Sequence, residues 1–244
     1  MDEKQQKELE ELKQWLEETK DTKLEEMGQF FGARIDSYEE HMAPWKDYYT
    51  WMAQILPEGT KELLDIGCGT GLELDAVFER FSEMQVTAID LSAEMLGQLK
   101  VKHGDKNLHF LCGDYFKVPF GEECYDAAIS FETLHHFISN RKIEVFRKLY
   151  NSLKPGGCYI EGDYIAGSRE AEELLLGECM RRRKRDGIAE EAFVHFDIPL
   201  TLDHEIEILK EAGFEKVEVL GYLGENRTPM IRAWKKQDAY TQRI

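Results

Sequence analysis

The chain has 244 residues, and 48 aspartates and glutamates against 31 lysines and arginines give it a formal net charge of −17. Such a surface repels phosphate backbones and anionic membranes, so nucleic acid is a disfavoured partner and no membrane is expected. The five cysteines include no C-x-x-C pair, no apolar run is long enough to cross a bilayer, and the acidic N-terminus lacks the form of a signal peptide. We therefore expect a cytoplasmic protein.

The first 58 residues are predicted to form a helical arm ahead of the main domain. Residues 2–26 place leucines and a tryptophan at helical spacing among glutamates and lysines, which is typical of an amphipathic helix. Residues 30–42 mix aromatic and ionisable side chains at the same spacing, with Tyr38 among them. The arm either lies on the main domain or covers a binding site as a lid.

A glycine-rich turn follows the first predicted strand. Residues 63–66 form a short apolar strand pattern, glycines alternate over residues 67–71, and a helical pattern comes next. Glycine lets the backbone approach a ligand closely because it has no Cβ. The next predicted strand, residues 85–89, is followed by Asp90, where a βαβ nucleotide site places a carboxylate for the ribose hydroxyls.

The glycine spacing distinguishes two kinds of nucleotide site. The dinucleotide fingerprint G-x-G-x-x-G requires a glycine at the position of Leu72. Here the third glycine comes one residue earlier, so that Asp65, Gly67, Gly69 and Gly71 form an acid-x-Gly-x-Gly-x-Gly motif. This motif resembles motif I of the class I S-adenosylmethionine (SAM) dependent methyltransferases.

The resemblance, which covers about residues 60–165 and more loosely the final strands, implies a fold and a cofactor. The implied fold is α/β: residues 59–244 form a SAM-binding domain with a doubly wound, mostly parallel seven-stranded sheet, preceded by the helical arm. The cofactor is SAM and its product S-adenosylhomocysteine. The residues placed at the cofactor are Tyr38, Asp65, Gly67, Cys68, Gly69, Gly71, Asp90, Leu91, Met95, Asp114, Tyr115 and Phe131. An ordinary place in the core explains Tyr38 and Met95 equally well.

Two segments near the end of the fourth and fifth strands carry candidate catalytic residues. The strand predicted over residues 125–131 precedes His135 and His136, in a segment that resembles motif IV and the loop after it. His135 is either a general base or a structural histidine bonded to backbone. One of the two histidines is expected to be structural, and the sequence does not tell which of them, if any, acts as a base. No H-E-x-x-H or Cys/His ligand spacing occurs nearby, so no metal site is predicted. Asp163 and Tyr164 lie at the end of the fifth strand, opposite the methyl donor.

A helical elaboration is predicted over residues 166–201, before the sheet is completed. Its helix, residues 168–186, begins acidic and ends in the basic run 181–185, which complements the helix dipole and could also contact an anionic substrate or RNA. The loop after the helix carries His195 as a second candidate base, with Asp197 as its orienting partner. In the family that the chain resembles, this segment covers the substrate.

We therefore predict a SAM-dependent methyltransferase that holds a small-molecule acceptor in line with the sulfonium methyl group. One alternative is a methyltransferase acting on RNA or protein, and another is a non-enzymatic SAM-binding regulatory module. There is no Asn-Pro-Pro-Tyr after the fourth strand and no Pro-Cys nucleophile, which argues against methylation of DNA bases. A monomer and a homodimer are both compatible with the sequence.

Overall fold

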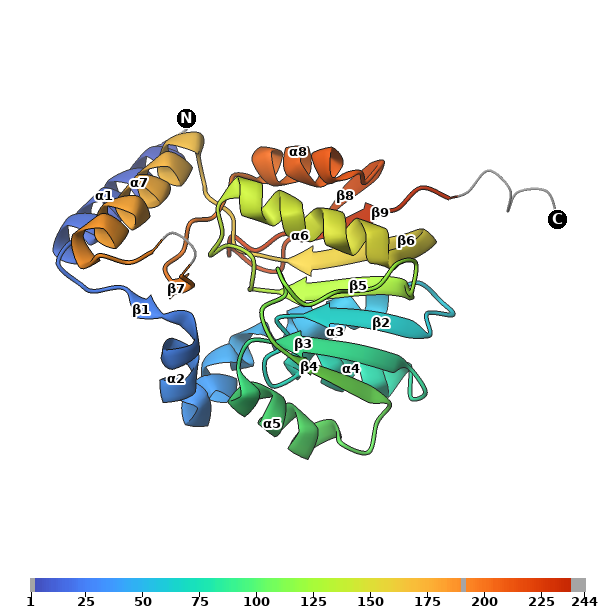
Figure 1. Cartoon of the computed structure of the whole chain (residues 1–244). Helices are drawn as coiled ribbons and strands as arrows, with labels where there is room; N and C mark the ends of the chain where they lie inside the picture. The colour runs from blue at the N-terminus through green and yellow to red at the C-terminus, as the bar shows by residue number, and fades with distance from the viewer. Residues whose placement is uncertain (1–2, 190–191, 238–244) are drawn as a thin grey trace.

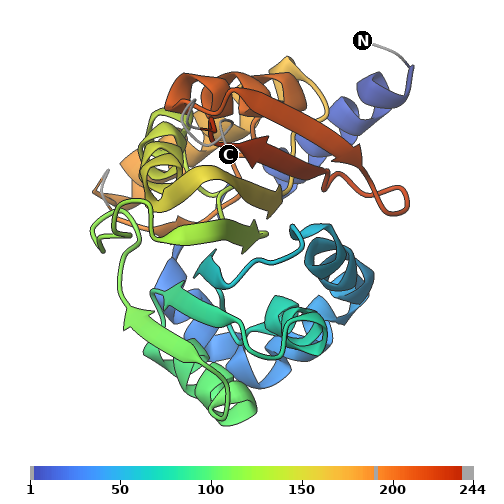
Figure 2. The ribbon, with the colours of Figure 1, turned by 90° about the vertical axis from the view of Figure 1, so that its right-hand side faces the viewer.

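The structure, a computed structural model, describes residues 3–189 and 192–237. Its centre is a seven-stranded sheet (Figures 1 and 2). The strands are β2 (Glu62–Ile66), β3 (Gln85–Asp90), β4 (Leu108–Cys112), β5 (Tyr125–Phe131), β6 (Leu153–Gly162), β8 (Lys216–Gly221) and β9 (Met230–Trp234). They lie in the order β4-β3-β2-β5-β6-β9-β8, and β9 runs antiparallel to both of its neighbours. The predicted doubly wound, mostly parallel α/β sheet is confirmed.

Helices cover both faces of this sheet. One face carries α3 (Lys46–Ile55), α4 (Leu72–Arg80) and α5 (Ala93–His103), and the other carries α6 (Ser139–Ser152) and α8 (Leu202–Ala212) (Figure 1). Successive residues of β2 pack against opposite layers: Leu63 faces the first group of helices and Leu64 the second. A strand that is buried on both faces is apolar almost throughout, which explains the apolar run before the glycine turn. Within residues 3–189 and 192–237, no helix is long and apolar enough to cross a membrane.

The N-terminal arm differs from its prediction. The pattern over residues 2–26 favoured one helix, whereas α1 spans Glu3–Glu18 and a short strand, β1 (Glu25–Glu26), follows it. β1 pairs antiparallel with β7 (Val194–His195). Pairing with a segment far along the chain therefore replaces the last turns of the predicted helix.

The arm and the elaboration together form a cap beyond the carboxyl ends of the central strands (Figure 1). We define the cap as α1, β1, α7 (Arg169–Asp186) and β7. α1 packs along α7, and leucines of α1 join Leu175 and Phe196 in a small apolar cluster. After β1 the chain continues into α2 (Met27–Met42) and, through the short helix η1 (Ala43–Trp45), into α3.

The fifth parallel strand, β6, ends before the two residues predicted at its end, Asp163 and Tyr164. β6 begins at Leu153, directly after α6, because Leu153 is already extended and pairs with Tyr125. It ends at Gly162, so Asp163 and Tyr164 lie just past its carboxyl end.

Candidate functional site

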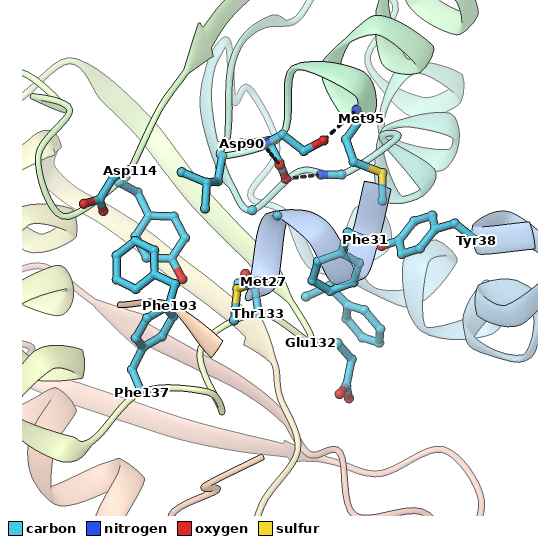
Figure 3. Close-up of a pocket in the computed structure, with 17 residues that line it drawn as sticks. Met27, Phe31, Tyr38, Asp90, Met95, Asp114, Glu132, Thr133, Phe137 and Phe193 are labelled. Carbon is cyan, nitrogen blue, oxygen red and sulfur yellow. Dashed lines mark hydrogen bonds between the residues drawn. The ribbon is translucent and has the colours of Figure 1, made fainter. Parts of the chain in front are cut away.

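A narrow cavity lies where the strand order reverses between β2 and β5, the place where open α/β sheets bind ligands (Figure 3). We call it the glycine-turn cavity, and its free volume is about 70 Å³. It is lined by most of the residues predicted at the cofactor: Tyr38, Gly67, Gly69, Asp90, Leu91, Met95, Asp114, Tyr115 and Phe131. Met27, Gly28 and Phe31 close it on the side of α2.

The turn after β2 requires glycine at two positions for different reasons. At Gly67 (φ +70°) a Cβ would lie 2.3 Å from Thr133 Oγ1, so only glycine lets the turn approach the loop after β5. At Gly71 (φ +73°) a Cβ would lie 2.3 Å from Leu99 Cδ1. Gly71 and Cys68 are buried, and the structure places them in the packing behind the turn.

Asp90 connects the glycine turn to α5. Its Oδ2 accepts a hydrogen bond from Gly69 N at 2.9 Å, and its Oδ1 accepts one from Ser92 N at 2.8 Å (Figure 3). Burial raises the pKa of this carboxyl, and the backbone donors oppose the rise. Each carboxylate oxygen can accept a further hydrogen bond, so Asp90 can also bind hydroxyl groups in the cavity that it lines.

Asp65, predicted at the cofactor, is fully buried beside Glu73 of α4. Burial, followed by the charge of Glu73, raises the pKa of Asp65 well above its usual value. Burial also raises the pKa of Glu73 to about 7. The two carboxyl groups behind the glycine turn therefore stay protonated to a higher pH than ordinary carboxyl groups.

The variant Glu73→Gln is expected to gain thermal stability relative to the wild type as the pH rises. The folded-state pKa of Glu73 is raised, so the stability present below about pH 4.5 is lost as the pH rises toward 7. Glutamine stays neutral and removes this loss. Thermal unfolding at pH 5 and pH 8 measures the effect: the difference in Tm, variant minus wild type, should be more positive at pH 8. A pH-independent difference would show that Glu73 is ionised in the folded protein.

The loop after β5 holds His135 and His136, both buried. His135 Nδ1 lies 2.6 Å from Asp163 Oδ1 and 3.7 Å from Glu132 Oε2. Burial alone would lower the pKa of His135, but the neighbouring carboxylates, Asp163 foremost, outweigh it and raise the pKa to about 9. His136 Nδ1 lies 3.2 Å from Asp197 Oδ1, and burial together with the His135 charge lowers the pKa of His136.

A buried lysine lies behind Asp163. Lys142 Nζ on α6 is 2.6 Å from the Glu205 carboxylate and 3.7 Å from Asp163 Oδ2, and the three side chains are at most 4% exposed. Lys142 and Glu205 were not predicted, because charged residues of amphipathic helices ordinarily face solvent. The sequence feature that could have indicated buried charges here is Glu161, a carboxyl group inside an apolar strand. It accepts a hydrogen bond from Tyr159 Oη at 2.9 Å.

A second cavity of about 610 Å³ lies beneath the cap, and we call it the cap cavity. Its walls include side chains of α1, α7, residues 19–25 and residues 195–197, together with Tyr164. The Tyr164 ring meets the His135 ring edge-on, with the centroids 6.0 Å apart. The cap cavity therefore adjoins the loop that holds His135 and His136, which we call the histidine loop.

The predicted partnership of His195 with Asp197 is corrected by the structure. The His195 ring stacks on Phe30, with the ring centroids 3.4 Å apart, and burial lowers its pKa to about 4. Asp197 instead faces the histidine loop, with its Oδ1 3.6 Å from His135 Nε2. The reason is a backbone hydrogen bond from Ile198 N to His135 O at 2.8 Å, which turns the chain after β7 toward that loop.

Known sequences match much of this chain. Residues 63–157 match a family described as a methyltransferase domain. A malonyl-[acyl-carrier protein] O-methyltransferase of Priestia megaterium is 36% identical over 106 residues, which cover 43% of this chain and 38% of that protein. The O-methyltransferase cnsE of Penicillium expansum is 25% identical over 187 residues, or 75% of this chain and 62% of that protein. The chain thus spans less than two thirds of the length of these relatives.

Solved structures share the fold. Human N-acetylserotonin methyltransferase in complex with SAM aligns with a TM-score of 0.60 and 18% identity, over 83% of this chain and 55% of that one. Phosphoethanolamine N-methyltransferase 2 of Haemonchus contortus in complex with SAM gives a TM-score of 0.57 and 19% identity, over 79% and 53%.

Proposed function

We propose that this chain, a class I SAM-dependent methyltransferase by its domain at residues 63–157, transfers the SAM methyl group to a small-molecule acceptor. The observation that carries the proposal is the cap cavity, whose volume of about 610 Å³ falls in the range of small-molecule sites. It adjoins the histidine loop, and residues just before that loop, Glu132 and Thr133, line the glycine-turn cavity. Donor and acceptor would therefore meet at this loop.

SAM is the cofactor, and the glycine-turn cavity has the groups to bind it. Asp90 would accept hydrogen bonds from the ribose hydroxyls, and Asp114 would accept one from the adenine amino group. Both residues line the cavity at the ends of neighbouring strands. Backbone at Gly67 and Gly69 would hold the methionyl end. Tyr38 lies beside this backbone, since a Cβ at Gly69 would lie 3.1 Å from Tyr38 Oη. Phe131 and Thr133 would lie near the methyl group.

The α2 side of the glycine-turn cavity must move to admit SAM. A free volume of about 70 Å³ is far below the roughly 300 Å³ at the lower end of ligand pockets. Met27, Gly28 and Phe31 lie on α2, a helix without a buried residue among its described positions. Few buried contacts mark a segment that opens at low free-energy cost. On this ground we assign the role of a lid to α2, whereas α3, also within the predicted arm of residues 1–58, packs in the core of the sheet.

The predicted catalytic residues take positions around the acceptor in this proposal. His195 and Tyr164 line the cap cavity, while His135 and Asp163 lie buried behind it. When bound, SAM supplies an activated sulfonium methyl group, so these residues chiefly orient the acceptor.

The variant His195→Ala is expected to bind SAM as the wild type does and to lose at least tenfold in kcat/KM. The His195 side chain lines the cap cavity rather than the glycine-turn cavity, and loss of a group that orients the acceptor costs up to about 10²-fold. Calorimetry measures the SAM affinity, and methyl transfer to an acceptor found by screening measures kcat/KM. His109→Ala, an exposed histidine of β4, is the matched control. A loss of SAM affinity in His195→Ala would contradict this placement.

Calorimetric titration with SAM, S-adenosylhomocysteine and NAD tests the proposal, followed by a screen of small molecules for S-adenosylhomocysteine release. We expect both adenosyl ligands to bind and NAD not to bind. Absence of binding by both adenosyl ligands would overturn it. Turnover with RNA or protein, and with none of the small molecules, would favour the alternative acceptor class.

The basic run at residues 181–185 gives little support to an RNA acceptor. Arg181 and Arg182 pair with Glu178, and the Arg182 side chain is 3% exposed. Arg181 and Arg185 also donate to the backbone carbonyl of Lys20. These arginines hold α7 to the segment after α1, which explains a basic run without a nucleic-acid partner.

A further inference from the structure

The side chains of His135, His136 and Asp197 converge beside the cap cavity. Their donor atoms, one ring nitrogen from each histidine and one carboxylate oxygen, lie within 4.8 Å of one another. The histidines are buried, whereas the Asp197 side chain is 45% exposed and lines the cap cavity. Two imidazoles and one carboxylate are a donor set that suits Zn²⁺ and its first-row neighbours.

The two distances from Asp197 Oδ1 fit a tetrahedral ion. Asp197 Oδ1 lies 3.2 Å from His136 Nδ1 and 3.6 Å from His135 Nε2. Two ligand atoms that are each about 2.0–2.1 Å from a tetrahedral Zn²⁺ are about 3.3 Å apart. A separation of 3.6 Å is too long for a hydrogen bond, so without a metal the two groups interact only as an ion pair of protonated His135 with Asp197.

Neighbouring groups hold His135 in the orientation that a ligand needs. Asp163 Oδ1 lies 2.6 Å from Nδ1, which leaves Nε2 directed at Asp197. A carboxylate on the second nitrogen of a metal-binding histidine fixes its tautomer and orientation. The hydrogen bond from Ile198 N to His135 O joins the two loops, so backbone contacts set the distance between ligands far apart in the sequence.

A second group, Glu132, His135 and Asp163, also has donor atoms within 4.8 Å of one another. It fits a metal less well. Asp163 lies within hydrogen-bond distance of His135 Nδ1, the same nitrogen that Glu132 faces at 3.7 Å. A cation there would have to break that hydrogen bond, whereas a cation at Asp197 would keep it and displace only the longer contact of His136 Nδ1 with Phe196 O at 3.4 Å.

The geometry points to a divalent transition-metal site formed by His135 Nε2, His136 Nδ1 and Asp197 Oδ1, with Asp163 as the outer partner of His135. Since Asp197 lines the cap cavity, the remaining coordination position faces that cavity. It would take an oxygen or nitrogen atom of the acceptor and hold it at the histidine loop. This role in holding the acceptor rests on the proposed function, whereas metal binding itself does not.

The test is a Co²⁺ titration of the whole chain, purified without a polyhistidine tag and dialysed against a chelator. Co²⁺ is a spectroscopic stand-in for Zn²⁺, and its visible absorption bands report four- or five-coordinate N/O ligation. We expect one Co²⁺ to bind per chain and to be displaced by Zn²⁺. His136→Gln and Asp197→Asn should each weaken binding at least tenfold, and circular dichroism establishes that each variant is folded. Asp197→Asn is nearly isosteric and only half-buried, so it keeps the fold.

Two control variants make the result specific. His109→Gln removes an exposed histidine of β4, and Glu132→Gln removes a ligand of the second group only, so both should bind Co²⁺ like the wild type. The proposal is overturned if the wild type binds no Co²⁺, if His136→Gln and Asp197→Asn bind it unchanged, or if Glu132→Gln alone loses it. A SAM titration of the same samples separates this outcome from failure of the proposed function.

Discussion

Asp90→Ala is expected to weaken SAM binding about a hundredfold. Its carboxylate lines the glycine-turn cavity and accepts hydrogen bonds from Gly69 N and Ser92 N. Alanine would remove the acceptors for the ribose hydroxyls and also release the backbone of the glycine turn. Two hydrogen bonds to a charged group contribute about 3 kcal/mol or more together, which corresponds to a hundredfold or more in Kd. Calorimetric titration of the variant with SAM measures the change.

Two further variants of the same experiment separate the carboxylate's contact with the ligand from general effects. Asp90→Asn keeps one oxygen acceptor and should fall between the wild type and Asp90→Ala. Asp105→Ala removes an exposed carboxylate before β4 and should leave the affinity unchanged. If Asp90→Ala bound SAM as tightly as the wild type, Asp90 would lie outside the cofactor site.

Lys142→Ala is expected to lower the free energy of unfolding by about 3–5 kcal/mol, the cost of removing one partner from a buried ion pair. Lys142 Nζ lies 2.6 Å from Glu205, and removal of the ammonium leaves that carboxylate buried without a counter-charge. Asp163, 3.7 Å from the same nitrogen, loses a second interaction. Urea unfolding of the variant and of the wild type under the same conditions measures the difference.

A double variant shows whether the cost comes from the unpaired charge. Lys142→Met combined with Glu205→Leu replaces both charges by apolar groups of similar size and should recover most of the lost stability, because a buried pair often breaks even against apolar residues. Arg147→Ala, on the exposed part of α6 where it pairs with Glu211, should cost less than about 1 kcal/mol. A similarly small cost for Lys142→Ala would contradict the assigned importance of the pair.

Much of the sheet and of the glycine-turn cavity could be predicted because their signals are local. A strand buried on both faces must be apolar, and a turn that packs against Thr133 without space for a Cβ must be glycine. These requirements leave short, contiguous patterns, such as the apolar run at residues 63–66 and the alternate glycines after it. The place of Asp90 follows from the same unit, since it ends the next parallel strand.

The cap and the histidine cluster could not be predicted because their contacts join segments far apart in the sequence. Residues 25–26 form a strand only because residues 194–195 lie beside them. Asp197 meets His135 through a backbone hydrogen bond at Ile198, for which no local pattern exists. From the sequence alone, Lys142 is expected to be a solvated helix residue. Its burial depends on Glu205, which α8 places against it.

The pairing of β1 with β7 has a consequence for the order of events during turnover. Glu25 of β1 lines the cap cavity, while Met27 and Gly28, directly after it, close the glycine-turn cavity. An acceptor in the cap cavity would hold this short ladder in place and keep the cofactor out. On the proposed function we therefore expect an ordered sequential scheme, in which SAM enters before the acceptor and S-adenosylhomocysteine leaves last.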